Sequence, residues 1–418
     1  MTRLTRGALA ADLEERVFSA PAVASLTPRR VGAEVELIPV DAATGRPCPL
    51  EGEEAPATLP FLRRFATRWG WTEERTAKGA VCFAVRDGGV LSFEPGGQLE
   101  YSSPPERSAS GLIDRLRAVV PPLRAAAAAE GITLLTAGID PRNPVEEVPL
   151  QLPSERYLRM AEHFARIGPW GARMMRQTAA FQLSLDFDDE PRDRWLLLNA
   201  LAPFLTAIFA NSAIYEGRYT GHQSFRAHCW RGLDPRRTGL PYDRWRPVEA
   251  YLDFALDAPA ILFPTVGGDC LPFGEWLARA NPTHAEWDTH LSTLFPEVRP
   301  RGHLELRSID AVDSAWYPAP VALVAGLCYE PRALHAALAL LPSPDLGLLE
   351  RAGRLGLGDP AIARIASELF EIGLAGCGAL GAKFIQPGHL EEARAYFERY
   401  TRAGRSPADE LRGCAVAA

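Results

Sequence analysis

The 418-residue chain has few cysteines, no long apolar run and no excess of positive charge. Its seven cysteines are scattered and form no CxxC pair, which disfavours a disulfide framework or a zinc–thiolate site. No stretch reaches the roughly 18 consecutive apolar residues that a membrane span needs. The net charge of -7 provides no basic field for nucleic acid or an anionic membrane. We therefore expect neither as a partner.

The N-terminal segment lacks the pattern of a secretory signal, because acidic residues interrupt it before an apolar core of signal length develops. This pattern predicts a cytoplasmic protein. The motifs GxxxxGK[ST] and strand-linked GxGxxG are absent too, so any nucleotide has to be bound in another way. We expect small-molecule substrates, and the sequence leaves open whether the chain is a monomer or a homodimer.

Apolar residues make up 47% of the chain, which is ordinary for a globular protein with a buried core. Strand patterns occur early and late, without a regular βαβ rhythm, and this favours an α+β fold with an antiparallel sheet. Strands are expected at 29–41, 81–86, 90–94, 97–102, 132–141, 179–187, 261–266 and 302–309. Helices are expected at 8–25, 58–69, 154–167, 108–131 with a kink or break at Pro121 and Pro122, and through the last 80 residues.

Two pairs of glutamates are the sharpest chemical feature of the sequence. Glu94 and Glu100 flank a Gly-Gly bend in EPGGQLEYSSPP, where Gln98 and Glu100 share a strand face. An exposed polar hairpin is the ordinary interpretation of one such pair. Glu34 and Glu36, however, share a face of the strand at 29–41. Four such carboxylates would repel one another unless cations lay between them, and Mg²⁺ prefers oxygen ligands of this kind.

A third feature is the segment RGHLELRSID, in which Glu305 and Arg307 share one strand face. The planar fork of an arginine pairs with two phosphate oxygens, although a surface Glu/Arg ladder would give the same pattern. Carboxylates, Mg²⁺ and an arginine could serve a kinase, a phosphohydrolase or an acyl-phosphate ligase, and spacing does not choose among them.

Six segments together resemble a known family. They lie between residues 32 and 412 and read GAEVELIP, EPGGQLEYSSPP, RMMRQTAAFQLSLDF, FANSAIYEGRYTGHQSFRAHCWRGLDPRRTG, TLFPEVRPRGHLELRSIDA and RYTRAGRSPADELR. The chain resembles the glutamate–cysteine ligases of the plant and bacterial type (GCS2), most closely the actinobacterial branch that serves ergothioneine synthesis. The resemblance implies a glutamine-synthetase-like α+β fold, with a curved, mainly antiparallel sheet forming a funnel and helices packed outside. It also implies one catalytic domain over 1–418, with a helical C-terminal portion from about 320.

The same resemblance implies an ATP-dependent ligation of the γ-carboxyl of L-glutamate to the amine of L-cysteine through a γ-glutamyl phosphate, with two or more Mg²⁺ ions. Arg307 would face the ATP phosphates and, with Glu100, act in catalysis. The expected metal ligands are Glu34, Glu36, Glu94, Glu100 and Glu305. The expected substrate-binding residues are Gln98, Arg176, Thr178, Gln182 and Arg226.

The sequence leaves three details open. Arg176, Thr178 and Gln182 would share one face only if 174–186 is extended. Trp230 is expected in the core rather than in the site. The stretch AILFPTVGGDCLPFGEW departs from what we expect of the family, which leaves a different amine acceptor as an alternative. A metal- and nucleotide-binding protein without turnover is the other alternative.

Overall fold

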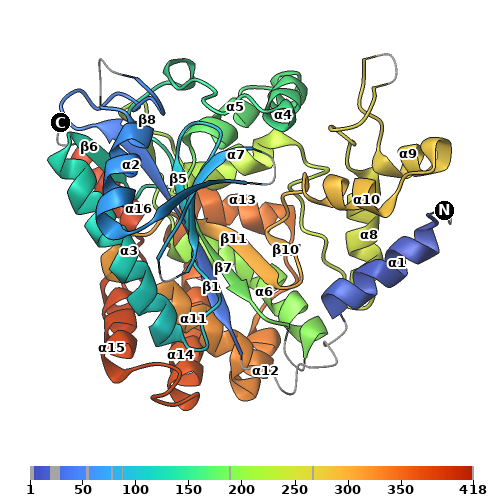
Figure 1. The fold of residues 1–418 in the computed structure, drawn as a ribbon. Coiled ribbons are helices and arrows are strands. Elements are labelled where there is room, and N and C mark those ends of the chain that lie inside the picture. Colours follow the sequence, from blue (N-terminus) through green and yellow to red (C-terminus); the bar gives the residue numbers. More distant parts are fainter. Residues whose placement is uncertain are drawn as a thin grey trace.

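The computed structural model describes residues 4–18, 29–52, 56–76, 79–86, 88–187, 190–265 and 268–416. Its centre is an open nine-stranded sheet in the order β10-β11-β7-β1-β5-β4-β3-β2, with β6 beside β1 (Figure 1). Every strand pair in the described sheet is antiparallel. The strands are β1 (Val31–Asp41), β2 (Thr72–Arg75), β3 (Val81–Ala84), β4 (Val90–Phe93), β5 (Leu99–Ser102), β6 (Ile132–Leu135), β7 (Ala180–Leu185), β10 (Val298–Pro300) and β11 (Leu304–Asp310).

The longest strand, β1, organises this sheet because it pairs with β5, β6 and β7. Val31, Ala33, Val35 and Leu37 are each at most 2% exposed. Side chains alternate between the two faces of a strand, so the glutamates between these apolar residues point away from them. The expected strand and the shared face of its two glutamates are therefore confirmed.

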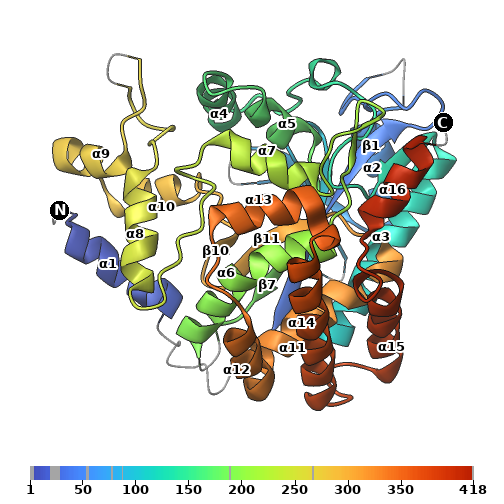
Figure 2. The same cartoon turned by 180° about the vertical axis from the view of Figure 1, so that it is seen from behind.

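Helices cover the apolar face of the sheet. Figure 2 shows α6, α11 and α14 in front of the strands when the molecule is seen from behind. Every residue of α11 is buried, and the main hydrophobic cluster contains residues from Leu4 to Tyr400. The helices are α1 (Arg6–Leu13), α2 (Thr58–Trp69), α3 (Ala109–Ala129), α4 (Glu155–Ala165), α5 (Trp170–Gln177), α6 (Pro191–Ile208), α7 (Phe225–Leu233), α8 (Pro247–Asp257), α9 (Phe273–Ala280), α10 (His284–Leu291), α11 (Pro318–Tyr329), α12 (Pro331–Leu340), α13 (Leu346–Leu355), α14 (Pro360–Ala379), α15 (Pro387–Tyr396) and α16 (Pro407–Val416).

The expected α+β class, the antiparallel sheet and the helical last 80 residues are confirmed. The helix at 108–131 is one continuous element, α3, so Pro121 and Pro122 do not divide it. Its first turn is capped by the Ser108 hydroxyl, which accepts a hydrogen bond from the Gly111 N–H at 3.0 Å.

Some expectations about secondary structure were wrong or lie outside the described residues. The expected strand at 261–266 is a turn where it is described, because Pro264 lacks the N–H that a strand ladder needs. Of the expected helix at 8–25, α1 and a π-helical turn, Glu14–Phe18, account for the first part. Residues 19–28, like Asp87 between the expected strands at 81–86 and 90–94, lie outside the described residues.

The cysteines and the helices of the described residues agree with the composition. The six cysteines with described side chains are free thiols. Among the helices that the structure describes, none is long and apolar enough to cross a membrane.

A buried histidine makes the stability of the fold depend on pH. His290 of α10 is fully buried, and its Nε2 lies 2.7 Å from the Ala255 carbonyl oxygen. Burial lowers the pKa of His290 to about 3. A histidine in the unfolded chain has a pKa of about 6.5, so below that pH the unfolded state gains a proton that the folded state does not.

We therefore expect acid to destabilise the fold through His290. Between pH 7 and pH 5 the wild type should lose about 2 kcal/mol more of its unfolding free energy than His290→Gln does. Urea unfolding at several pH values measures this difference, and His284→Gln, at an exposed histidine of the same helix, is the control. Parallel pH curves for wild type and His290→Gln would contradict the prediction.

Candidate active site

A cavity of about 330 Å³ lies against the polar face of the sheet, and it contains most of the expected site residues. Its walls come from β1, the β4–β5 turn, α4, α5, β7, α7 and the β10–β11 hairpin. Four glutamates on one side of the cavity form what we name the acidic wall. They are Glu34, Glu36, Glu94 and Glu100.

Strand register brings the acidic wall together. Glu36 of β1 stands directly opposite Glu100 of β5, and Glu34 stands opposite Gln182 of β7. Directly opposed like charges destabilise a sheet, so this arrangement calls for a compensating cation. Glu94 joins the wall from the end of β4, where its backbone N–H donates to the Gln98 carbonyl oxygen at 2.8 Å.

The turn between β4 and β5 depends on its two glycines. Gly97 has a φ of 87°, which favours glycine. At Gly96 a Cβ atom would lie 2.2 Å from the Arg176 carbonyl oxygen, so only glycine lets this turn pack against the end of α5. The Gly-Gly bend therefore positions Glu94 and Glu100 against the helix that forms the next wall.

The acidic wall is electrostatically unfavourable by itself. Burial, followed by neighbouring carboxylates, raises the pKa of Glu94 to about 8 and that of Glu100 well above its usual range. Burial likewise raises the pKa of Glu36 to about 6 and raises that of Glu34. Among the described residues, none donates a hydrogen bond to the carboxylate of Glu34 or Glu94. The wall therefore offers open, buried carboxylate oxygens, which are the ligands that Mg²⁺ prefers.

Three arginines face the acidic wall, and we name them the basic wall: Arg299, Arg301 and Arg307. All three surround the buried carboxylate of Glu305. Arg299 Nε donates to Glu305 Oε2 at 2.8 Å, Arg301 Nη1 donates to Oε1 at 2.9 Å, and Arg307 Nη1 donates to Oε2 at 2.6 Å. Burial alone would raise the pKa of Glu305, but Arg299 and Arg307 hold it below its usual range.

The structure places Glu305 apart from the other four glutamates that are expected to bind metal. It does not line the cavity, and both of its oxygens accept hydrogen bonds from arginines. The reason is the short strand β10, whose pairing with β11 places Arg299 directly opposite Glu305. In this structure Glu305 orders the basic wall.

Gln182 joins the two walls. Its Nε2 donates to Glu36 Oε1 at 3.0 Å, and its Oε1 accepts a hydrogen bond from Arg307 Nη1. The Ala180 N–H donates to the other Glu36 oxygen at 2.8 Å. Gln182 is 2% exposed, so this bridge is part of the floor of the cavity.

Arg226 of α7 lines the cavity and is held from behind. Its Nη2 donates to the Arg307 carbonyl oxygen at 2.9 Å, and its Nη1 lies 3.7 Å from Asp310 Oδ1. Trp230 lines the cavity as well, and it also packs against a hydrophobic cluster, as expected. Its ring centroid is 5.8 Å from the Arg226 guanidinium carbon and 5.6 Å from that of Arg307, so it contacts both cations.

The loop before α7 is anchored by the last described helix. Gln223 Nε2 donates to Asp409 Oδ1 of α16 at 3.2 Å, across 186 residues of sequence. The Ala408 N–H donates to the Ala210 carbonyl oxygen at 2.9 Å. These contacts fix the start of the helix that carries Arg226.

The end of α5 places the other expected substrate residues. Thr178 lines the cavity, and its hydroxyl donates to the Met174 carbonyl oxygen at 2.7 Å. Gln98 Nε2 donates to the Thr178 carbonyl oxygen at 3.0 Å, which ties the glycine turn to α5. The condition that 174–186 is extended throughout is not met, because α5 continues to Gln177. Arg176 consequently lines a different cavity and does not join the others.

Sequence reasoning missed several residues of the cavity. Arg299 and Arg301 alternate in VRPR, directly before the expected strand at 302–309, so their period of two was a usable signal. Arg156 and Tyr157, at the start of α4, also line the cavity. Arg156 donates to the Ser292 carbonyl oxygen at 2.7 Å, and no local pattern indicated this contact.

The segment that departs from the expected family pattern lies behind the cavity wall. No described residue between 259 and 272 lines the cavity. Ile261 packs in one hydrophobic cluster with Met160, Met175 and Phe295, and these three do line it. This segment therefore packs behind the apolar side of the cavity and does not form the cavity surface.

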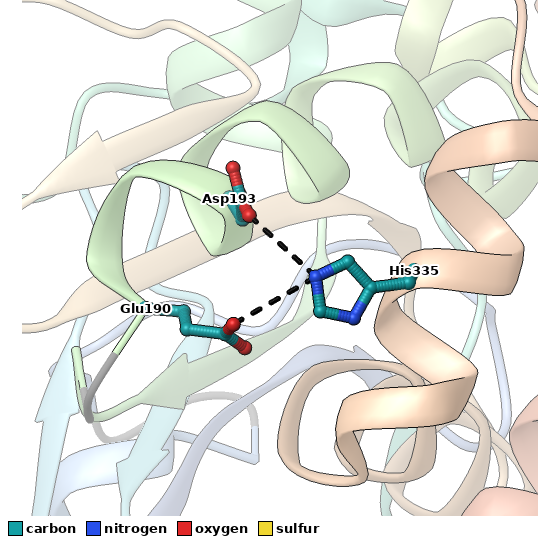
Figure 3. A group of neighbouring side chains, drawn as sticks. All are labelled: Glu190, Asp193 and His335. Carbon is teal, nitrogen blue, oxygen red and sulfur yellow. Dashed lines mark ion pairs between the residues drawn. The ribbon is translucent and has the colours of Figure 1, made fainter.

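A separate group of possible metal ligands lies at the outside of the molecule, where α6 meets α12. His335 Nε2 is 3.7 Å from Glu190 Oε1 and 3.9 Å from Asp193 Oδ2 (Figure 3). Among the described residues, only this group holds three ligand atoms within 4.8 Å of one another, so the acidic wall is more widely spaced. A protonated His335 would satisfy both carboxylates as a surface ion pair.

A buried acidic wall opposite a basic wall, on an antiparallel sheet, is an arrangement suited to enzymes that hold divalent cations beside phosphate groups. The model of glutamate–cysteine ligase family 2 (GCS2) matches residues 30–416, and the chain belongs to this family.

The relatives of the chain include bacterial and plant proteins. It is 35% identical over 348 residues to "Glutamate--cysteine ligase EgtA" of Mycolicibacterium smegmatis, covering 79% of each protein. It is 30% identical over 407 residues to the chloroplastic glutamate–cysteine ligase of Arabidopsis thaliana, covering 91% of this chain and 75% of the other. A solved structure, glutamate–cysteine ligase of Francisella tularensis in complex with AMP, aligns over 93% of each chain with 13% identity and a TM-score of 0.45.

Removing the Glu305 carboxylate from the arginine cluster should strongly lower the free energy of unfolding. Glu305→Ala would leave three guanidinium groups without their shared carboxylate, and removing one partner of a buried ion pair costs about 3 kcal/mol or more. We expect that loss in the free energy of urea unfolding. Glu275→Ala removes an exposed partner of Arg279 and should cost under about 1 kcal/mol. Equal effects of the two substitutions would show that Glu305 does not stabilise the basic wall.

Proposed function

We propose that the protein is a glutamate–cysteine ligase, which joins the γ-carboxyl of L-glutamate to the amine of L-cysteine while ATP becomes ADP and phosphate. The observation that carries the proposal is the acidic wall facing the basic wall in one cavity of a chain from this family. The relatives named glutamate–cysteine ligase support the same activity.

The acidic wall fits Mg²⁺ by its chemistry. All four glutamates line the cavity, and the carboxylates of Glu34 and Glu94 accept no hydrogen bond from a described residue. We propose that the four hold two or more ions, with Glu305 ordering the arginines behind them. Bound Mg²⁺ would screen the negative charges of the phosphates and of the attacking carboxylate.

The basic wall is proposed to bind the anionic parts of the substrates. Arg307 presents a guanidinium fixed by Glu305, Gln182 and Trp230, so it is preorganised to pair with phosphate oxygens of ATP. Arg226 is held from behind and faces the cavity, which suits it to bind a substrate carboxylate. Thr178, Gln98 and Gln182 shape the glutamate subsite.

The proposed reaction has two steps that balance. A γ-carboxylate oxygen of glutamate attacks the γ-phosphorus of ATP, the bond from that phosphorus to the ADP oxygen breaks, and ADP leaves with the electron pair. The amine nitrogen of cysteine then attacks the γ-carbonyl carbon, and phosphate leaves with the C–O electron pair. The proton of the amine passes to the departing phosphate as the amide forms. The basic wall stabilises the charge that moves through both steps.

The place of the reaction in the cell is proposed from the sequence. The resemblance to the actinobacterial branch supports a role in ergothioneine or related thiol synthesis, in the cytoplasm, with small-molecule substrates. The cavity is lined on its apolar side by Met160, Met175 and Phe295, which is compatible with a small, weakly polar acceptor side chain such as that of cysteine.

A panel of amines tests the acceptor. With ATP, Mg²⁺ and L-glutamate present, we expect L-cysteine to raise ADP release well above the control without amine. L-Serine, which replaces the thiol by a hydroxyl, should be a much poorer acceptor, because its hydroxyl is costlier to desolvate against that apolar side. The mass of the product identifies the amide. If cysteine releases no more ADP than the control, the proposed acceptor is wrong.

Glu100→Gln tests the acidic wall. The substitution removes one anionic ligand with little change of shape, so we expect ADP release to fall by roughly a hundredfold or more. Glu106→Gln is the matched control, because Glu106 pairs with Arg115 and does not line the cavity. Thermal unfolding checks that both variants fold. A near-normal rate in Glu100→Gln would remove Glu100 from the proposed site.

A further inference from the structure

A second cavity of about 430 Å³ lies on the other side of α5 from the site described above. Its walls come from α5, from α4 and from the segment that precedes α4. Leu150, Ala161 and Ala172 contribute to its apolar surface. Met175 lines both cavities, so α5 is the partition between them. The volume falls within the range that is typical of small-molecule sites.

Two charged side chains of opposite sign line this cavity, and neither has an ionic partner among the described residues. Arg176 is half-buried, and its one described hydrogen bond is a long one, 3.4 Å from Nε to the Ala172 carbonyl oxygen in its own helix. Glu146 is exposed in the short 3-10 helix Val145–Glu147 and makes no described ion pair. The two lie close enough for Glu146 to act on the pKa of Arg176, which burial lowers.

Arg176 is half-buried without a carboxylate partner within ion-pair distance among the described residues, and burial of a charge is costly unless the charge is paired. Arg237, by contrast, is fully buried and pairs with Asp234 at 2.9 Å. Arg176 therefore presents a partly desolvated guanidinium to the cavity, and such a group favours a carboxylate ligand. One arginine alone is a weak site for phosphate, and the rest of the surface is apolar apart from Glu146.

We propose that this cavity binds a small amphipathic zwitterion, such as an amino acid with an aliphatic side chain. The carboxylate of the ligand pairs with Arg176, its ammonium group pairs with Glu146, and its side chain packs against Leu150, Ala161 and Ala172. This site is distinct from the proposed ligase site, since the acidic and basic walls lie on the other side of α5.

Titration calorimetry with L-leucine tests the proposal without ATP or glutamate, so its result does not depend on ligase activity. The two analogues are 4-methylpentanoate, which lacks the ammonium group, and 3-methylbutylamine, which lacks the carboxylate. We expect L-leucine to bind and each analogue to bind about tenfold or more weakly, because each loses one charged contact. Equal binding of 4-methylpentanoate and leucine would overturn the zwitterion assignment.

Variants place the ligand in this cavity. Arg176→Gln should weaken leucine binding about tenfold or more, whereas Arg364→Gln, at an exposed arginine paired with Glu368, should leave it unchanged. Ala172→Leu fills the cavity without altering its charges and should also abolish binding. Thermal unfolding confirms that each variant is folded. The proposal is overturned if the wild type does not bind leucine, or if both cavity variants bind it as the wild type does.

Discussion

The Glu305 carboxylate, buried under three arginines, is the interaction on which the arrangement of the site depends. Without it, Arg299, Arg301 and Arg307 would be drawn toward the nearest other anions, which are the glutamates of the acidic wall. Glu305 neutralises only part of their charge and fixes their positions. The cavity therefore keeps open carboxylates on one side and ordered cations on the other, which is preorganisation rather than mutual neutralisation.

The register of β1 is the second constraint. Its apolar residues face the helices and its glutamates face the cavity, so a slip of one residue would move Glu34 and Glu36 into the core. Such a slip is energetically unfavourable, because burying two carboxylates among aliphatic side chains costs far more free energy than leaving them at the cavity. The same alternation that builds the core thus places the charged groups of the site.

The sequence predicted the positions of side chains where polar and apolar residues alternate along a strand. It did not predict them where contacts between distant segments determine the structure. Alternation in β1 and in the glycine hairpin predicted the acidic wall correctly. The residues around Arg176 did not show by themselves whether the segment is extended, and the structure has the helix α5 there, whose end packs against Gly96. The shielding of Glu305 depends on its pairing with β10, a three-residue strand that contains a proline. Arg156 lines the cavity from α4, which is far from β10 in sequence. The alternation of Arg299 and Arg301 was a local signal, but their pairing with Glu305 and the contact of Arg156 leave none.

The anchoring of the loop before α7 by α16 has a consequence for how the chain is made. The contact between Gln223 and Asp409 spans 186 residues, so a growing chain exposes the Arg226 region long before its brace exists. Contacts of such long sequence separation also form late, because much chain entropy has to be lost first. A nascent chain could complete its sheet and still have the cavity unfinished until α16 emerged and docked.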